Sequence, residues 1–94
     1  MARDDEIDGD PVAIERKRLR YRSWHRGTRE ADLLLGRFAD AHLPAMDAAQ
    51  LERFAALLEL IDPDLVDWLA GRSPPPAGHD NDVAALLGSF SARR

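Results

Sequence analysis

The sequence predicts an all-α protein, a single domain folded as a bundle of five short helices. Apolar residues recur at spacings of three and four along most of the chain, which is typical of amphipathic helices. No stretch alternates apolar and polar residues between hairpin turns, so strands are not predicted. The length of 94 residues suits one domain, and a composition of 45% hydrophobic and 32% charged residues is that of a globular protein.

The first helix is predicted over residues 12–26, where the helical domain of residues 12–94 begins. Before it, residues 1–11 are acidic and lack helical periodicity, so a flexible tail is expected. Three apolar side chains can share one face of this helix: Ile14, Tyr21 and Trp24. Three arginines at four-residue spacing are expected to form a separate ridge: Arg18, Arg22 and Arg26.

The second helix is predicted over residues 29–42, directly after Gly27 and Thr28. Gly27 suits the left-handed conformation that follows a helix, and Thr28 is a good N-cap. Two acids, Glu30 and Asp32, fall in the first turn, where the helix dipole favours negative charge. The expected buried stripe consists of Ala31, Leu34, Leu35 and Phe38.

The third helix is predicted to start after Asp47 and to end near Ile61. Asp47 and Gln50 have the spacing of a capping box, in which each side chain bonds the backbone of the other. Pro44 interrupts the chain just before this start. The apolar stripe of this helix is expected to consist of Leu51, Phe54, Leu58 and Ile61.

The fourth helix is predicted to start at once, with Asp62 as its N-cap, Pro63 as its first residue and Gly71 as its stop. Its apolar face is expected to consist of Leu65, Trp68 and Leu69. We expect Trp68 to lie in the core rather than on a binding surface. Residues 73–78 are proline-rich and predict an extended spacer, and residues 82–91 predict the last helix.

No pattern in the sequence indicates an active site, so we do not expect an enzyme. The absence of cysteine excludes disulfides, thiolate nucleophiles and zinc–thiolate sites. The three histidines lack the spacing of a metal site, and no glycine-rich phosphate loop is present. No apolar run reaches the roughly 20 residues that span a bilayer. The acidic start resembles neither a secretory signal nor a mitochondrial presequence, which predicts the cytoplasm.

The corner between the first two helices, "SWHRGTREAD" at residues 23–32, allows two interpretations. In the first, Gly27 and Thr28 only end and start helices, and Arg26 with Glu30 forms a solvated local pair. In the second, the corner is a binding surface, where a glycine lets another molecule approach and the charged side chains hydrogen-bond to it. A third possibility is nucleic-acid binding by the basic first helix, although the net charge of the chain is -4.

Two short signatures make the chain resemble the bacterial SdhE family of FAD assembly factors and the mitochondrial succinate dehydrogenase assembly factors. The Arg-Gly-x-x-Glu signature of this family stands at residues 26–30, and its following acid is matched by Asp32. The second signature is matched by Asp62, Pro63, Asp64, Leu65, Trp68 and Leu69. The resemblance covers roughly residues 14–90 and includes the layout of five helices.

The resemblance implies a chaperone-like factor that promotes covalent attachment of FAD to the flavoprotein subunit of succinate dehydrogenase, and in some bacteria of fumarate reductase. It implies that FAD is attached to the partner and is not tightly bound by this chain. The expected docking residues are Arg26, Gly27 and Glu30, with Arg29 and Asp32 as weaker members and Trp24 as a neighbouring anchor. We expect a monomer that neither inserts into membranes nor binds nucleic acid. The alternative is a general protein-interaction bundle that uses the same corner.

Overall fold

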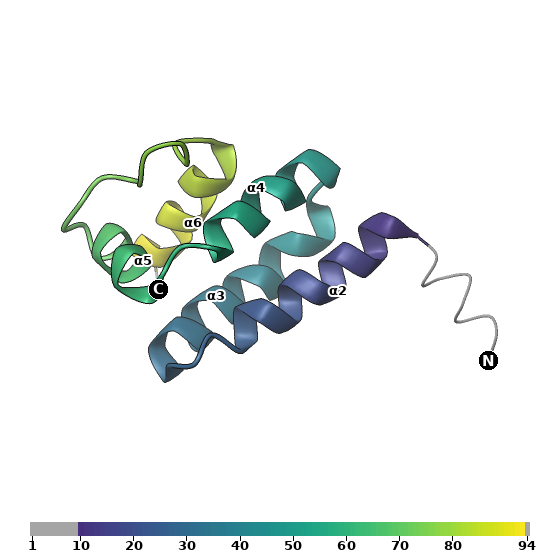
Figure 1. Cartoon of the computed structure of the whole chain (residues 1–94), viewed down its shortest axis with the longest axis horizontal. Helices are drawn as coiled ribbons and strands as arrows, with labels where there is room; N and C mark the ends of the chain where they lie inside the picture. Colours follow the sequence, from purple (N-terminus) through teal and green to yellow (C-terminus); the bar gives the residue numbers. More distant parts are fainter. Residues whose placement is uncertain (1–9, 94) are drawn as a thin grey trace.

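The computed structural model describes residues 10–93, which form five α-helices and one 3-10 turn (Figure 1). The elements are α2 (Pro11–Trp24), α3 (Arg29–His42), η1 (Leu43–Ala45), α4 (Ala48–Leu58), α5 (Asp62–Leu69) and α6 (Asp82–Arg93). No strand occurs within the described range, which confirms the all-α prediction. Most of the predicted acidic tail lies outside the described residues, and Pro11 already belongs to α2.

The helices are arranged around a long α2–α3 hairpin. Figure 1 shows α3 running back alongside α2, with α4 running in a similar direction next to the pair and α5 and α6 beyond it. α6 packs against both α3 and α4, and α5 packs on α6. The loop between α5 and α6 contains the proline-rich spacer, which is not helical, as predicted. The corner between α2 and α3 therefore lies at one end of the hairpin, on the side of the molecule where α5 starts.

Two fully buried phenylalanines form the centre of the core. The ring of Phe38 on α3 lies 5.4 Å from that of Phe54 on α4 and 5.6 Å from that of Phe90 on α6. Burial of such side chains is the main stabilising term of a domain this small. Trp68 is buried in the same cluster, which confirms its predicted place in the core.

Helix starts that depend on neighbouring residues were predicted well. Thr28 accepts a hydrogen bond from the backbone of Ala31 at 3.3 Å and caps α3, which spans the predicted residues. Asp47 and Gln50 form both bonds of the capping box at the start of α4. Gly27 has a φ of 114°, so it occupies the left-handed region as predicted.

The predicted buried face of the first helix was wrong. Ile14 and Tyr21 are 38% and 65% exposed, whereas Leu19 and Ser23 are fully buried. Ser23 satisfies its hydroxyl by donating to the carbonyl of Leu19, so a polar side chain can occupy this close contact. Arg16 lies near the same face and donates to two carbonyls at the end of α3 and η1, those of Leu43 and Met46. The spacing of apolar residues did not predict this buried face, because one of its two buried side chains, that of Ser23, is polar.

The predicted joint between the third and fourth helices was wrong as well. α4 ends at Leu58, and Ile61 is 64% exposed and stands at the N-cap position of α5. Asp62 is the first residue of α5 rather than its cap, and its carboxylate binds a side chain from the α2–α3 corner instead of the start of its own helix. Two further helix ends differ by two residues from the predicted ones: α2 ends at Trp24 instead of residue 26, and α6 ends at Arg93 instead of residue 91.

Candidate functional site

The corner between α2 and α3 is held together by the first turn of α3. One carboxylate oxygen of Asp32 accepts hydrogen bonds from the backbone N–H groups of Arg26, at 2.6 Å, and Gly27, at 3.2 Å. Asp32 thereby satisfies two backbone donors beyond the end of α2. Its carboxylate has a structural function in the corner that the sequence pattern did not reveal.

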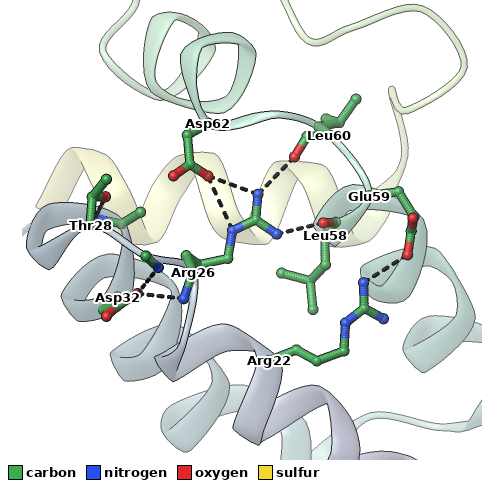
Figure 2. Close-up of polar contacts among 10 residues, drawn as sticks. Arg22, Arg26, Thr28, Asp32, Leu58, Glu59, Leu60 and Asp62 are labelled. Carbon is green, nitrogen blue, oxygen red and sulfur yellow. Dashed lines mark hydrogen bonds and ion pairs between the residues drawn. The ribbon is translucent and has the colours of Figure 1, made fainter.

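Arg26 connects this corner to the joint between α4 and α5 (Figure 2). Its guanidinium donates to the carbonyl oxygens of Leu58 and Leu60 and to the carboxylate of Asp62, the last at 2.9 Å. The side chain of Arg26 is only 11% exposed. The two signature stretches of the sequence therefore meet in space, because Arg26 belongs to the first and Asp62 to the second. The local ion pair with Glu30 that one interpretation assumed is not formed.

The arginines that were predicted to form one ridge each bind a different acid. Arg18 pairs with Glu15, and Arg22 pairs with Glu59 beside the Arg26 cluster (Figure 2). A further arginine of α2, Arg20, pairs with an acid of α3. These pairs compensate much of the positive charge of α2, so the structure offers no support for a nucleic-acid interface there.

Residues 27–30, here called the corner strip, are all exposed. A Cβ atom added to Gly27 would have no neighbour within 4 Å, so the backbone here is open to another molecule. Within residues 10–93, neither the guanidinium of Arg29 nor the carboxylate of Glu30 makes a hydrogen bond or ion pair. The corner strip thus presents two unpaired charges next to bare backbone, on a corner held from behind by Arg26 and Asp32.

Trp24 is half-buried at the end of α2, and its ring packs against α3. Its ring covers Gly36, where an added Cβ atom would lie 2.1 Å from the ring, and its indole N–H donates to Asp40 at 3.3 Å. Tyr21 and His25 form an exposed stack beside it, with ring centroids 4.0 Å apart. Gly36 therefore has to be a glycine, because any side chain there would collide with the ring of Trp24. The role of Trp24 as an anchor for a partner stays a prediction.

Asp40, which accepts hydrogen bonds from Arg20 and Trp24, gives α2 and α3 a pH-sensitive contact. The hydrogen bond from Arg20 is the main cause that lowers the pKa of Asp40 from its ordinary value of 3.8. Because the pKa is lower in the folded protein, the stabilisation is present above pH 3.8 and is lost as the pH falls through the folded value.

We expect Asp40→Asn to lower the free energy of unfolding at neutral pH by less than about 1 kcal/mol, since the pair is exposed. The variant should also lose less stability than the native chain on acidification from about pH 5 to about pH 2. Urea unfolding at a series of pH values measures both effects. Asp80→Asn is a suitable control, because Asp80 is exposed and its carboxylate makes no hydrogen bond to another described residue. An identical pH dependence in the native chain and Asp40→Asn would contradict this role.

A small apolar pocket of about 50 Å³ opens next to the corner strip, between α3 and α5. Glu30 and Asp62 stand among its lining residues, and the rest of the lining is apolar. Sequence reasoning missed this pocket because its two walls come from different helices, whose lining residues are at least 27 positions apart, from Leu35 to Asp62 (62 − 35 = 27).

Neither metal-binding nor membrane-spanning features occur in the described part of the chain. Residues 10–93 contain no group of three or more histidine, aspartate or glutamate side chains that could hold a metal ion. None of their helices combines the length and the apolar character that crossing a membrane requires.

Residues 17–91 match the family model described as "Flavinator of succinate dehydrogenase". The chain belongs to this flavinator family. The matched residues run from α2 to α6 and include both signatures, so the resemblance noted in the sequence is confirmed. The corner strip, Arg26 and Asp62 all lie within the matched residues.

Curated relatives of the flavinator family carry the names of assembly factors, which agrees with the expectation that this chain is not an enzyme. It is 46% identical to the FAD assembly factor SdhE of Acetobacter pasteurianus, over 71% of this chain and 62% of the relative. It is 38% identical to succinate dehydrogenase assembly factor 2 of Aedes aegypti, over 87% of this chain and 52% of the relative. It is 36% identical to succinate dehydrogenase assembly factor 2 of Dictyostelium discoideum, over 87% of this chain and 60% of the relative. The chain thus spans between half and two thirds of the length of these relatives, and no solved structure matches it.

Proposed function

We propose that this chain is an assembly factor that promotes covalent attachment of FAD to the flavoprotein subunit of succinate dehydrogenase. In this proposal the chain binds that subunit through the corner strip. Membership of the flavinator family supports the client and the cofactor. The single structural observation that carries the docking surface is the open backbone of Gly27 beside the unpaired Arg29 and Glu30.

The proposal gives the corner residues two kinds of role. Arg26 and Asp32 position the corner, because their side chains are bonded to the chain itself. Gly27, Arg29 and Glu30 contact the partner, through close approach of the backbone and charge-assisted hydrogen bonds. A corner that is rigid before binding loses little conformational freedom on docking, which favours affinity.

The reacting groups belong to the partner in this proposal, since the bond joins a methyl group of the flavin ring to a histidine of the flavoprotein. The contribution of this chain is to hold the partner in a conformation in which these two groups meet. Fixing two reactants in the correct orientation can supply several kcal/mol of rate enhancement without any catalytic side chain from the helper.

We expect Glu30→Ala to reduce the yield of covalently bound flavin by about tenfold or more, as loss of one charge-assisted contact of about 1.4 kcal/mol implies. The stability of the chain should change by less than about 0.5 kcal/mol, because Glu30 is exposed and makes no hydrogen bond or ion pair within residues 10–93. In-gel flavin fluorescence of the denatured flavoprotein, from cells that carry only the variant, measures the yield. Glu52→Ala, an equally exposed change on α4, should leave the yield unchanged. Full fluorescence with Glu30→Ala would remove Glu30 from the docking surface.

We place this activity in the cytoplasm, with the chain acting as a monomer, and extend it to the flavoprotein subunit of fumarate reductase where a cell makes that enzyme. A pull-down from the native cells, with the eluted partner tested for covalent flavin, distinguishes this proposal from a general interaction bundle. Such a bundle would capture a partner that carries no flavin.

A further inference from the structure

The pocket between α3 and α5 is an apolar hollow next to the corner strip. Its apolar walls are built from Ala31, Leu34 and Leu35 of α3 and from Leu65, Val66 and Leu69 of α5. Its volume of about 50 Å³ has room for about three or four heavy atoms. A short aliphatic side chain matches such a space, and its apolar lining favours one.

The pocket is open because α5 is packed on α6 and makes only sparse contact with α3. The distance between the two helices is held by Arg26, which binds the start of α5 through Asp62 and the preceding turn through Leu60. The pocket is therefore part of the same rigid corner as the corner strip. Glu30 belongs to both, since it ends the strip and lines the pocket.

The uncompensated charge at the rim of the pocket is the carboxylate of Glu30, because the charge of Asp62 is paired with Arg26. The carboxylate of Glu30 has no partner within residues 10–93, and Asp62 uses only one of its two oxygens to bind Arg26. No lysine or arginine lines the pocket, and the guanidinium of Arg26 is largely hidden. A cation brought to this rim gains a charge-assisted hydrogen bond, whereas an added carboxylate is repelled.

We propose that this pocket binds an aliphatic side chain of the flavoprotein partner that lies next to a lysine or arginine. The aliphatic group fills the space between α3 and α5, and the neighbouring cation binds Glu30. This inference rests on the proposed function and names the kind of segment that its docking site selects. The apolar contact supplies affinity at a buried position, and the acidic rim rejects segments of the wrong charge.

Photo-cross-linking can identify the bound segment, because the chain contains no cysteine. Asp67 is exposed on α5, next to Val66 of the pocket wall but outside the lining itself, so Asp67→Cys carries a benzophenone maleimide beside the pocket without filling it. Irradiation with the purified flavoprotein subunit, followed by mass spectrometry, should yield a partner peptide in which an aliphatic residue adjoins a lysine or arginine. Ala85→Cys, on an exposed part of α6 away from the pocket, is the matched control. Cross-links to an acidic segment, to a second copy of this chain, or equally from both positions would overturn the proposal.

Filling the pocket tests the same inference by affinity. Ala70→Leu and Val66→Phe should each weaken binding of the flavoprotein subunit by about tenfold or more in calorimetry, whereas Ala85→Leu should leave it unchanged. Circular dichroism of each variant checks that the helices are intact. Gly27→Arg separates the two proposals, because it blocks the corner strip and leaves the pocket open. Native affinity in both pocket-filling variants, together with loss of binding in Gly27→Arg, would overturn the pocket and leave the corner strip standing. Native affinity in Gly27→Arg would overturn the docking site itself.

Discussion

Replacing Arg26 by alanine is expected to lower the free energy of unfolding by about 3 kcal/mol. The substitution removes the hydrogen bonds to the carbonyls of Leu58 and Leu60 and leaves the carboxylate of Asp62 without its cation. Breaking a buried ion pair costs about 3–5 kcal/mol, and the lower end applies because Asp62 keeps 26% of its side chain exposed to water. A small domain has only about 5–15 kcal/mol of total stability, so this loss is large.

Urea unfolding followed by circular dichroism measures this effect. Arg18→Ala is the matched control, because Arg18 also forms an ion pair but is 64% exposed, and its loss should cost less than about 1 kcal/mol. Arg26→Lys should fall between the two, since a lysine keeps the charge but cannot reach three separated acceptors with a planar group. Equal stability of Arg26→Ala and Arg18→Ala would show that the internal contacts of Arg26 do not hold the corner.

Gly27→Arg is expected to weaken binding of the flavoprotein subunit by about a hundredfold or more while the bundle stays folded. A long charged side chain at this position would project into the space through which the partner approaches the backbone, and an intermolecular clash or an unpaired charge costs several kcal/mol. Among the described residues other than its two chain neighbours, no heavy atom lies within 4 Å of the first carbon of the added side chain, so the helices are not forced apart. The φ of 114° strains any side chain there by roughly 1–3 kcal/mol, which lowers the stability but should not unfold the domain.

Gly27→Ala separates the two effects of this substitution, because it carries the same backbone strain without the long side chain. Its affinity for the flavoprotein subunit should stay within about tenfold of the native value, measured by calorimetry with purified proteins. Comparable losses of binding in both variants would assign the effect to the backbone conformation rather than to an obstructed surface. Unfolding of Gly27→Arg would instead favour the interpretation in which the glycine serves only the turn.

Together these two substitutions assign opposite roles to adjacent residues of one short signature. Arg26 faces inward and determines stability, whereas Gly27 faces outward and, in our proposal, determines binding. The sequence pattern presents them as a single docking motif. The folded structure separates their roles: the side chain of Arg26 points into the molecule and positions the corner strip, whereas the backbone of Gly27 is exposed as part of that strip.

The parts of the fold that were predicted correctly depend on short-range interactions. The span of α3, the cap at Thr28 and the capping box of α4 involve residues within three positions of one another. Their hydrogen bonds are made by the local backbone wherever the helix lies, so the residue types are sufficient to predict them. The same holds for the positive φ of Gly27 and for the breaks caused by prolines.

The incorrect predictions concern contacts between elements far apart in the chain. The buried face of α2 includes Ser23, whose hydroxyl donates a hydrogen bond to the carbonyl of Leu19. Ile61 is exposed because α4 ends at Leu58, before it reaches this residue. Neither choice follows from hydrophobic spacing, because a polar side chain can be buried when a partner is present and an apolar one can remain at the surface.

The sequence by itself determined the helical class, the starts of α3 and α4, the central core residues and, through its two signatures, the family of the chain. The tertiary structure decided that those signatures are one unit, because Arg26 reaches the carbonyls before α5 and the carboxylate of Asp62 across the corner. It also decided that the carboxylate of Glu30 has no partner among residues 10–93 and that a pocket lies beside it. The chain contains many acidic residues that a guanidinium can bind. The packing of α2 against the joint between α4 and α5 selects Asp62 as the acid that Arg26 binds.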